Sequence, residues 1–198
     1  MIVVGVTGSL ASGKSEAAKM LKRRGAKVFD ADLAARQAIG IGKPAYKAIV
    51  KIFGKQYLKK NGELNRKKLA ERVFSDPGGL KKLNILIHPG VIFECLKMIE
   101  VYKKKPGILV LDVPLLFESK MECLADHTVV VVSDKKKILS RAKKQGIPET
   151  LANKIVDKQW PLKKKVRLAD FVVENNGTLE GFEKKILEVI KKIKQKAA

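Results

Sequence analysis

Residues Gly8 to Ser15 constrain the fold more than any other stretch of this chain. They read GSLASGKS and fit the pattern GxxxxGK[ST] at every position. Glycines at the two ends let the backbone curl so that its N–H groups point inward at a phosphate, and Lys14 places a positive charge against the β- and γ-phosphates. The hydroxyl of Ser15 can ligate Mg²⁺, and a following helix would add the positive end of its dipole.

The flanking sequence supplies the context that such a loop requires. The run from Ile2 to Val6, IVVGV, is apolar without alternation, which is typical of a central strand in a parallel sheet. Alanine and leucine then recur at three- and four-residue steps, which predicts a helix from Ser15 to about Arg24. We therefore predict a nucleotide-binding loop whose contacts come from Gly8, Ser9, Ala11, Ser12, Gly13, Lys14, Ser15 and Glu16.

Further apolar runs predict the rest of a sheet. One begins at Lys27, two span Gly107 to Glu118 and His127 to Ser133, and the last ends at Glu174. Between them, residues 34–104 read as mostly helical and residues 135–166 as basic and helical. Helix breaks are predicted at Gly42, Lys43-Pro44, Gly54, Asn61-Gly62 and residues 76–79. The expected class is an α/β fold with a parallel sheet and two helical excursions.

The composition bounds the choice of partners. The 198 residues are 45% hydrophobic, enough for one sizeable core, and the formal net charge of +22 implies attraction to polyanions. Lysines and apolar residues alternate at helical spacing from Lys184 to Lys196, which favours a surface helix with one docked face. A dedicated nucleic-acid arm is the alternative, but base-stacking aromatics are scarce, so we expect no specific nucleic-acid partner.

No apolar run approaches the roughly 18 residues that span a bilayer, and the first residues, MIVVGVTG, lack the features of a signal peptide. We therefore expect a cytoplasmic protein without a membrane partner. Cys95 and Cys123 lie far apart with no paired motif, so we expect ordinary thiols and neither a disulfide nor a zinc site.

Three aspartates follow predicted strands. Asp30 and Asp32 come directly after the second strand, whose end should lie beside the phosphate-binding loop, where a phosphoryl acceptor would bind. Alternate positions of an extended segment would point both carboxylates to the site; alternatively, Asp32 caps the next helix. We favour Asp32 as the catalytic carboxylate. Asp112 closes an apolar run that resembles a Walker B strand, in which such a carboxylate reaches Mg²⁺ directly or through water; alternatively, Asp112 only ends the strand, since an aspartate often follows an apolar run.

Several short strings, in their order along the chain, resemble the dephospho-CoA kinase family. The resemblance extends from about Ile2 to Gly177. The matching strings are Phe29–Asp32 with Ala35-Arg36 for the DAD segment, Leu83-Asn84 with His88-Pro89 for LN…HP, Val113–Glu118 for PLLFE, and Gln159, Lys165, Ala169-Asp170 and Asn175 for Q…K…AD…N.

This resemblance implies transfer of a phosphoryl group from ATP to the 3′-hydroxyl of dephospho-CoA, with Mg²⁺ as the metal. It also implies a P-loop kinase-type sheet flanked by helices, with a helical substrate-binding insertion and a helical lid. The implied core comprises residues 1–33, 106–134 and 167–198, the substrate domain residues 34–105, and the lid residues 135–166. We expect the protein to be a monomer or a weak homo-oligomer.

The resemblance also implies roles for single residues. Asp32 would accept the hydroxyl proton, Lys14 and Arg141 would act on the transferring group, and Ser15 would hold Mg²⁺ with Asp112. Asn175 would contribute to the nucleotide site. The residues implied in substrate binding are Asp32, Arg66, His88, Pro89, Lys144 and Lys165.

Some of these positions keep a second interpretation. His88 either contacts the substrate or hydrogen-bonds to the backbone at a helix break before Pro89. Arg66 either binds phosphate or is a solvated surface residue. Phe117 and Glu118 either line the acceptor pocket or, as we favour, close a strand.

Two features depart from the family pattern. The family usually carries arginines in its lid, but the stretch from Arg141 to Gly146 reads RAKKQG, with Lys144 in the place of a second arginine. A lysine gives a point charge in place of a planar fork, which argues against bidentate phosphate clamping there. Ile92 stands where the family frequently has an arginine.

The phosphate-binding loop by itself does not exclude other functions. The main one is a P-loop kinase for another small acceptor, such as a nucleoside or nucleotide. A nucleic-acid-binding ATPase would suit the charge. A regulatory GTPase would need an NKxD motif, and Asn153 to Asp157, NKIVD, has the wrong spacing.

Overall fold

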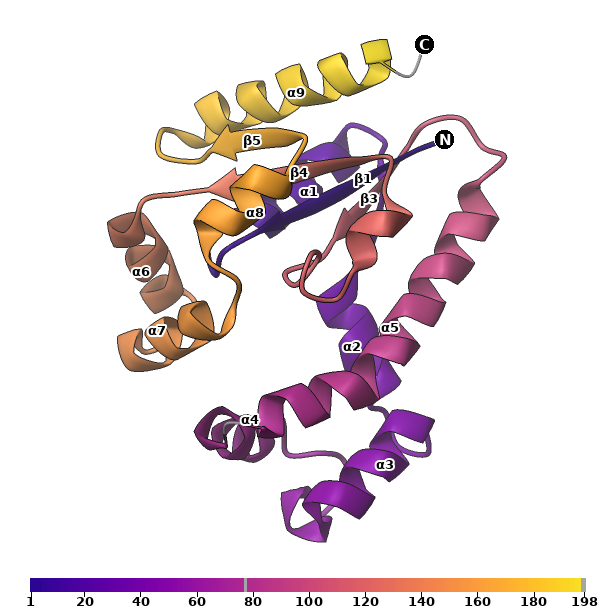
Figure 1. The fold of residues 1–198 in the computed structure, drawn as a ribbon, viewed down its shortest axis with the longest axis vertical. Helices are drawn as coiled ribbons and strands as arrows, with labels where there is room; N and C mark the ends of the chain where they lie inside the picture. Colours follow the sequence, from indigo (N-terminus) through magenta and orange to yellow (C-terminus); the bar gives the residue numbers. More distant parts are fainter. Residues whose placement is uncertain (77, 197–198) are drawn as a thin grey trace. The chain divides into compact units, whose positions relative to one another are not determined.

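The computed structural model describes residues 1–76 and 78–196, without the side chain of Phe74. In this described part, a five-stranded, fully parallel sheet has the strand order β2-β3-β1-β4-β5 (Figure 1). The strands are β1 (Ile2–Gly8), β2 (Lys27–Asp30), β3 (Ile108–Asp112), β4 (His127–Val132) and β5 (Phe171–Glu174). The predicted α/β class with a parallel sheet is confirmed.

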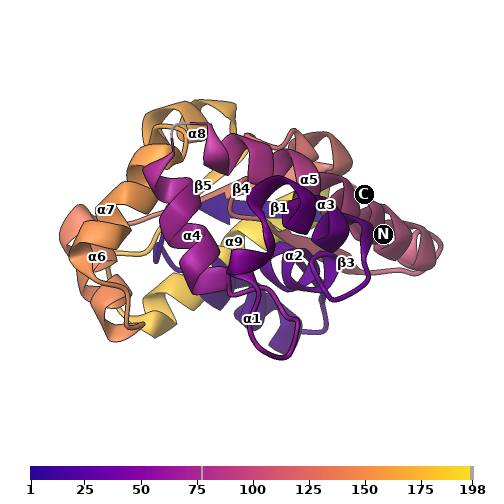
Figure 2. The ribbon, with the colours of Figure 1, turned by 90° about the horizontal axis from the view of Figure 1, so that it is seen from below.

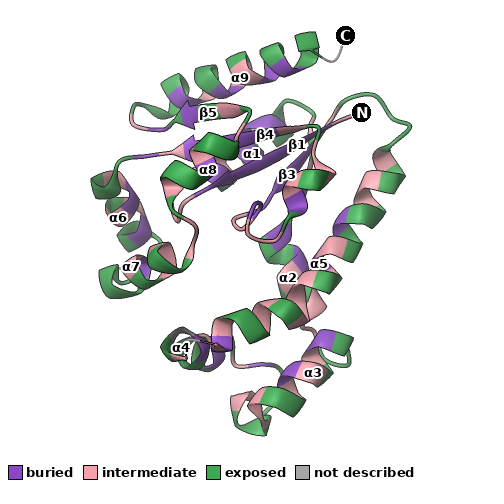
Figure 3. Ribbon diagram, in the orientation of Figure 1, coloured by how far each residue is buried: buried purple, intermediate pink, exposed green. Residues whose placement is uncertain are grey.

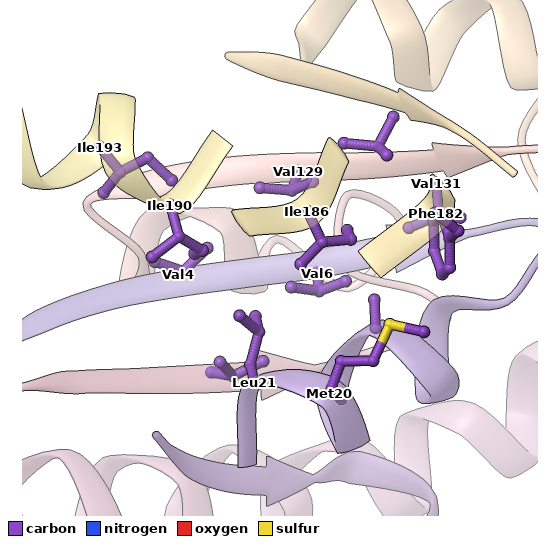
Figure 4. Packing of buried hydrophobic residues seen from close by; sticks show 14 residues of the cluster. Val4, Val6, Met20, Leu21, Val129, Val131, Phe182, Ile186, Ile190 and Ile193 are labelled. Atoms are coloured by element: carbon purple, nitrogen blue, oxygen red, sulfur yellow. The ribbon is translucent and has the colours of Figure 1, made fainter. Parts of the chain in front are cut away.

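The central strands are buried on both faces, as their unbroken apolar runs predicted. Val4 and Val6 of β1 pack with α1 (Lys14–Arg23) and α9 (Leu179–Lys196) on one face. Figure 4 shows this core, with Met20 and Leu21 of α1 and the isoleucines of α9 meeting the valines of the sheet. Because both faces are covered, alternation of polar and apolar residues is absent from these strands.

Helix α9 is the predicted basic surface helix. Phe182, Ile186, Ile190 and Ile193 are buried against the sheet, and most of the lysines between them are exposed (Figure 3). The positive charges of this helix therefore lie in solvent while its apolar stripe completes the core.

The predicted basic segment of residues 135–166 is helical. It forms α6 (Lys135–Lys144), α7 (Glu149–Lys158) and the start of α8 (Leu162–Leu168). Helices α6 and α7 lie side by side in both ribbon views (Figures 1 and 2). A short 3-10 helix, η2 (Met121–Leu124), lies between β3 and β4.

The chain divides into two compact units, one of residues Ala31–Lys97 and one of residues 1–30 with Met98 onward. The first, the helical unit, contains α2 (Ala31–Ala38), α3 (Pro44–Phe53), η1 (Lys55–Tyr57), α4 (Arg66–Ser75) and most of α5 (Gly79–Tyr102). Its own core is formed by Ile49, Leu64, Leu69 and Val73.

Local sequence explains where these helices begin and end. Pro44 opens α3, where its missing N–H would have no partner, and Gly54 ends the helix with φ +96°. The Asn65 side chain caps α4 by accepting from the Lys68 N–H at 3.1 Å. The predicted breaks at Lys43-Pro44 and Gly54 are confirmed; the predicted break at residues 76–79 includes Pro77, which lies outside the described residues.

The structure contradicts two of the alternatives that the sequence left open. Helix α5 continues through Pro89, so there is no helix break before this residue; the proline only removes one N–H from the helical ladder. Helix α2 begins at Ala31, so Asp30 to Asp32 is not an extended segment, and Asp32 lies in the first turn of α2. The positive end of the helix dipole favours a carboxylate at that position.

Asp170 joins the starts of β4 and β5, and we expect it to make stability depend on pH. Burial raises its pKa, but the hydrogen bonds from the Thr128 hydroxyl (2.8 Å) and N–H (2.7 Å) outweigh this and hold the pKa below its ordinary 3.8. A depressed pKa stabilises the fold above the unfolded-state value, and this contribution is lost as the pH falls through the lower folded-state value.

Asp170→Asn is therefore expected to lower the free energy of unfolding at pH 7 by about 1 kcal/mol, a modest figure because the side chain is largely exposed. The difference from the wild type should shrink below about pH 4. Urea unfolding at pH 7 and pH 3 measures both values. A loss of the same size at both pH values would contradict the proposed charge dependence.

Candidate functional site

The loop between β1 and α1 has the curl that the sequence pattern predicts. Gly13 has φ +106° and Ala11 φ +53°, both in the left-handed region that turns the chain sharply. The turn is closed by the Ser12 N–H, which donates to the Ser9 carbonyl at 3.2 Å, and α1 follows at Lys14. The N-terminus of α1 thus lies directly after the loop, as an anion site requires.

Both terminal glycines of the loop are required by space. A Cβ on Gly8 would lie 2.5 Å from the carbonyl oxygen of Val131, and one on Gly13 would collide with the side-chain amide of Asn175. A larger residue at Gly8 would therefore have to displace the Val131 backbone, and one at Gly13 the Asn175 side chain.

Two hydroxyl groups of the loop are buried without a hydrogen-bond partner. They are the Oγ atoms of Ser9 and Ser12. Buried polar atoms are normally satisfied, and an exception calls for an explanation. A phosphate bound in the loop explains these two hydroxyls, since phosphate oxygens accept hydrogen bonds from hydroxyl groups.

Lys14, Ser15 and Asp112 come together beside the loop. Lys14 is 8% exposed, and its ammonium makes an ion pair with the Asp112 carboxylate and lies 3.3 Å from the Ser15 hydroxyl. Residue Asp112 reaches this position because β3 pairs with β1 in the register Val6 to Asp112. A cation, a carboxylate and a hydroxyl that are distant in sequence therefore meet at the carboxyl end of the central strands.

This donor set suits Mg²⁺. Mg²⁺ takes oxygen ligands, usually one or two from protein and the rest from phosphates and water. The Ser15 hydroxyl and the Asp112 carboxylate supply such oxygens. Within the described residues there is no cluster of three or more His, Cys, Asp or Glu side chains that could hold a metal by itself.

Arg141 and Asn175 hold the carbonyl of Ser12 from behind the loop. The Asn175 amide donates to it at 2.8 Å, and the Arg141 guanidinium at 3.3 Å. The same guanidinium donates to the Ser133 hydroxyl at 3.1 Å and to the Asn175 carbonyl at 3.0 Å. Arg141 therefore lies at the phosphate-binding loop, as part of a hydrogen-bonded support that includes Ser133, a residue that the sequence did not single out.

Three other predicted residues of this unit have different surroundings. Glu16 faces outward and pairs with Arg23 at 3.5 Å. Lys144 is exposed at the end of α6, one turn after Arg141. Lys165 is 1% exposed, and its ammonium pairs with Glu118 at 2.8 Å. Lys165 belongs to a run of three lysines, and nothing in the sequence predicted that this one would be buried.

The helical unit holds the remaining predicted residues. Asp32 is exposed in the first turn of α2, and His88 and Pro89 are adjacent in α5. Arg66 is the first residue of α4, and its guanidinium donates to the Arg36 carbonyl at 3.5 Å.

Arg66 also lines a pocket of about 670 Å³ within this unit. Its walls combine apolar residues with three cations and one carboxylate. They are formed by Ile39, Gly40, Ile41, Lys59, Glu63, Leu64, Asn65, Arg66 and Lys67. Lys59 and Lys67 had no distinguishing signal in the sequence, because the pattern of a lysine-rich chain does not tell which lysines face a pocket.

His88 is half-buried, and desolvation lowers its pKa below the ordinary 6.5. At pH 7 the imidazole is therefore neutral, with one nitrogen that donates and one that accepts a hydrogen bond. This suits contact with a hydroxyl or an amide better than pairing with a phosphate.

No helix in the described part of the chain has both the length and the apolar character needed to cross a bilayer.

Comparisons with known proteins agree with this geometry. The family model for dephospho-CoA kinase matches residues 2–181. A dephospho-CoA kinase of Bacillus anthracis is 39% identical over 193 residues, which is 96% of each chain.

Two solved structures have similar folds. TT1252 from Thermus thermophilus has a TM-score of 0.79 at 30% identity, covering 96% of this chain and 95% of its own. A dephospho-CoA kinase from Campylobacter jejuni has a TM-score of 0.72 at 26% identity, covering 99% of this chain and 98% of its own. The predicted kinase-type fold is confirmed, and the chain belongs to the dephospho-CoA kinase family.

Proposed function

We propose that this protein transfers the γ-phosphoryl group of ATP to the 3′-hydroxyl of dephospho-CoA, giving CoA and ADP. The observation that carries this proposal is the curled loop with the Lys14–Asp112 ion pair beside it, in a chain of the dephospho-CoA kinase family. The loop offers N–H groups, buried hydroxyls and one cation to a triphosphate, which is the equipment that phosphoryl transfer needs.

On the donor side, the loop from Gly8 to Ser15 binds the phosphates. Mg²⁺, when bound, neutralises charge on the phosphate oxygens; the Ser15 hydroxyl and the Asp112 carboxylate would hold it. Lys14 then places its ammonium against the group in transfer. Arg141 and Asn175 keep the Ser12 carbonyl turned away from the phosphates, so that the N–H groups of the loop face them.

On the acceptor side, Asp32 receives the proton of the attacking hydroxyl. A loose transition state lets this transfer occur late, so the carboxylate need not be a strong base. His88 and Pro89 contact the substrate, and the neutral imidazole of His88 can hydrogen-bond to its polar groups. Lys144 adds a positive charge near the phosphates without the bidentate geometry of an arginine.

The pocket beside Arg66 fits part of the same acceptor. Dephospho-CoA combines a pyrophosphate with a long, mostly apolar pantetheine arm. Arg66 and Lys67 offer two cations to the first, while Lys59 pairs with Glu63 at 3.0 Å; the isoleucines and Leu64 offer apolar walls to the second. We assign the pyrophosphate to this cationic pocket within the helical unit.

We further propose a cytoplasmic protein that works as a monomer or weak homo-oligomer, without a specific nucleic-acid partner. The +22 charge is consistent with a substrate pair that carries several phosphates.

The test is a coupled ADP-release assay with a panel of acceptors. We expect dephospho-CoA to be phosphorylated, with at least about tenfold higher kcat/KM than adenosine, AMP or deoxynucleosides, because only dephospho-CoA can also fill the pocket beside Arg66. ³¹P NMR of the product should show a new 3′-monoester. Preference for a nucleoside, or ATP turnover stimulated by DNA or RNA instead, would contradict the proposal.

A further inference from the structure

A buried ion pair lies outside the phosphate-binding loop and has no part in the mechanism above. Lys165 of α8 is 1% exposed, and the side chain of its partner Glu118 is 12% exposed. Burying two charges costs a desolvation free energy that their attraction often does not recover, so such a pair is weak evidence for stability. Its presence therefore calls for another reason.

The pair connects two segments that are far apart in sequence. The Glu118 Oε1 atom accepts from the Lys165 ammonium at 2.8 Å and from the Trp160 N–H at 2.9 Å. Trp160 lies between α7 and α8, near the end of the basic segment of residues 135–166. Glu118 lies in the loop between β3 and η2. One carboxylate oxygen thus attaches the end of the basic segment to that loop.

The same lysine reaches the neighbourhood of Asp112. The Lys165 ammonium donates to the Pro114 carbonyl at 3.1 Å, and the Thr7 hydroxyl donates to the same oxygen at 3.1 Å. The Val113 N–H donates to the Val6 carbonyl at 3.1 Å. The turn directly after Asp112 is therefore held by β1 on one side and by Lys165 on the other.

The second carboxylate oxygen of Glu118, Oε2, is buried without a hydrogen-bond partner. A partly satisfied buried network is destabilising compared with an apolar one, which again argues that stability is not its purpose.

We propose that Glu118 and Lys165 are positioning residues for the reaction. Lys165 holds the Pro114 carbonyl and thereby the Asp112 carboxylate beside Lys14. Glu118 holds Lys165 in place and attaches the end of the basic segment at Trp160. Lys165 acts through these groups and not by contact with the substrate. The proposal rests on the proposed function only in that a phosphoryl transfer is measured.

The test is the double variant Glu118→Gln/Lys165→Met, which removes both charges and leaves an oxygen for the Trp160 N–H. Because no unpaired charge remains, we expect its melting temperature to stay close to that of the wild type. We expect kcat to fall by about 10²-fold, as for a misplacement of about 1 Å, with the KM for ATP changed less than about threefold. The Lys163→Met variant, at an exposed lysine of the same helix, is the matched control.

Trp160 is the single tryptophan of the chain, so its fluorescence reports on this attachment point. We expect acrylamide to quench it more strongly in the double variant than in the wild type and in Lys163→Met. A folded double variant with wild-type kcat would overturn the proposal, and so would a loss expressed only in the KM for dephospho-CoA, which would make Lys165 a substrate ligand.

If the double variant does not fold, Glu118→Asp decides the matter, because it keeps both charges but shortens the side chain that holds the Lys165 ammonium and the Trp160 N–H. An unchanged kcat in this variant would overturn the proposal, and a lower kcat at constant KM for ATP would support it. Failure of the proposed function is a separate result, in which the wild type does not phosphorylate dephospho-CoA. The kcat of each variant relative to the wild type would then be measured for ATP hydrolysis.

Discussion

Lys14→Met is expected to lower kcat by about 10²- to 10³-fold, the range found when one preorganised charge or donor is removed from a transition state. The reason is local: the loop holds Lys14 beside Ser15 and Asp112. In the proposed reaction its ammonium faces the charge that develops on the phosphoryl group. Methionine retains the length of the side chain and removes only the charge. Single-turnover kinetics with saturating ATP and acceptor measure the effect on the chemical step.

This substitution also leaves Asp112 buried without its ion-pair partner. We therefore expect a lower melting temperature, so the kinetics should be measured at a temperature where circular dichroism shows the folded state. Lys19→Met, at an exposed lysine of the same helix, is the control for a general loss of charge. A Lys14→Met enzyme within tenfold of the wild-type kcat would remove Lys14 from the transition state.

Asp32→Asn is expected to lower kcat by about 10²- to 10⁴-fold, the usual contribution of a general base. Asparagine has nearly the same shape but cannot take the proton of the attacking hydroxyl. Binding of ATP should change little, because the loop, Lys14 and Asp112 belong to the other compact unit. The experiment pairs steady-state rates with isothermal titration of a non-hydrolysable ATP analogue.

Glu71→Gln is the matched control, since this carboxylate is exposed on α4 of the same unit. Full activity of Asp32→Asn would show that no base is needed at that position, and loss of nucleotide affinity would assign Asp32 to binding. Loss of kcat at constant nucleotide affinity is the one result that agrees with the role proposed here.

The sequence alone determined the parts of this protein that depend on neighbouring residues. The strand before Gly8, the loop and helix α1 follow from local pattern, and so do the buried strands and the docked face of α9. Such elements are predictable because the period of the apolar residues and the conformational freedom of glycine act over a few positions. The order of the short strings was enough to suggest the family.

Only the tertiary structure decided which distant side chains meet. Arg141 and Asn175 share the Ser12 carbonyl because β4 and β5 end beside the loop, and no local pattern encodes that register. Helix α5 passes through Pro89, although a proline in a helix interior removes one hydrogen bond and the local pattern favours a break there.

The same limit applies to charge. Forty-two lysines and arginines look alike in the sequence, yet one of them, Lys165, is buried against Glu118 and three others line one pocket. Burial and pairing of a charge depend on the free energy of its whole surroundings, which the chain acquires only when segments far apart in sequence pack together.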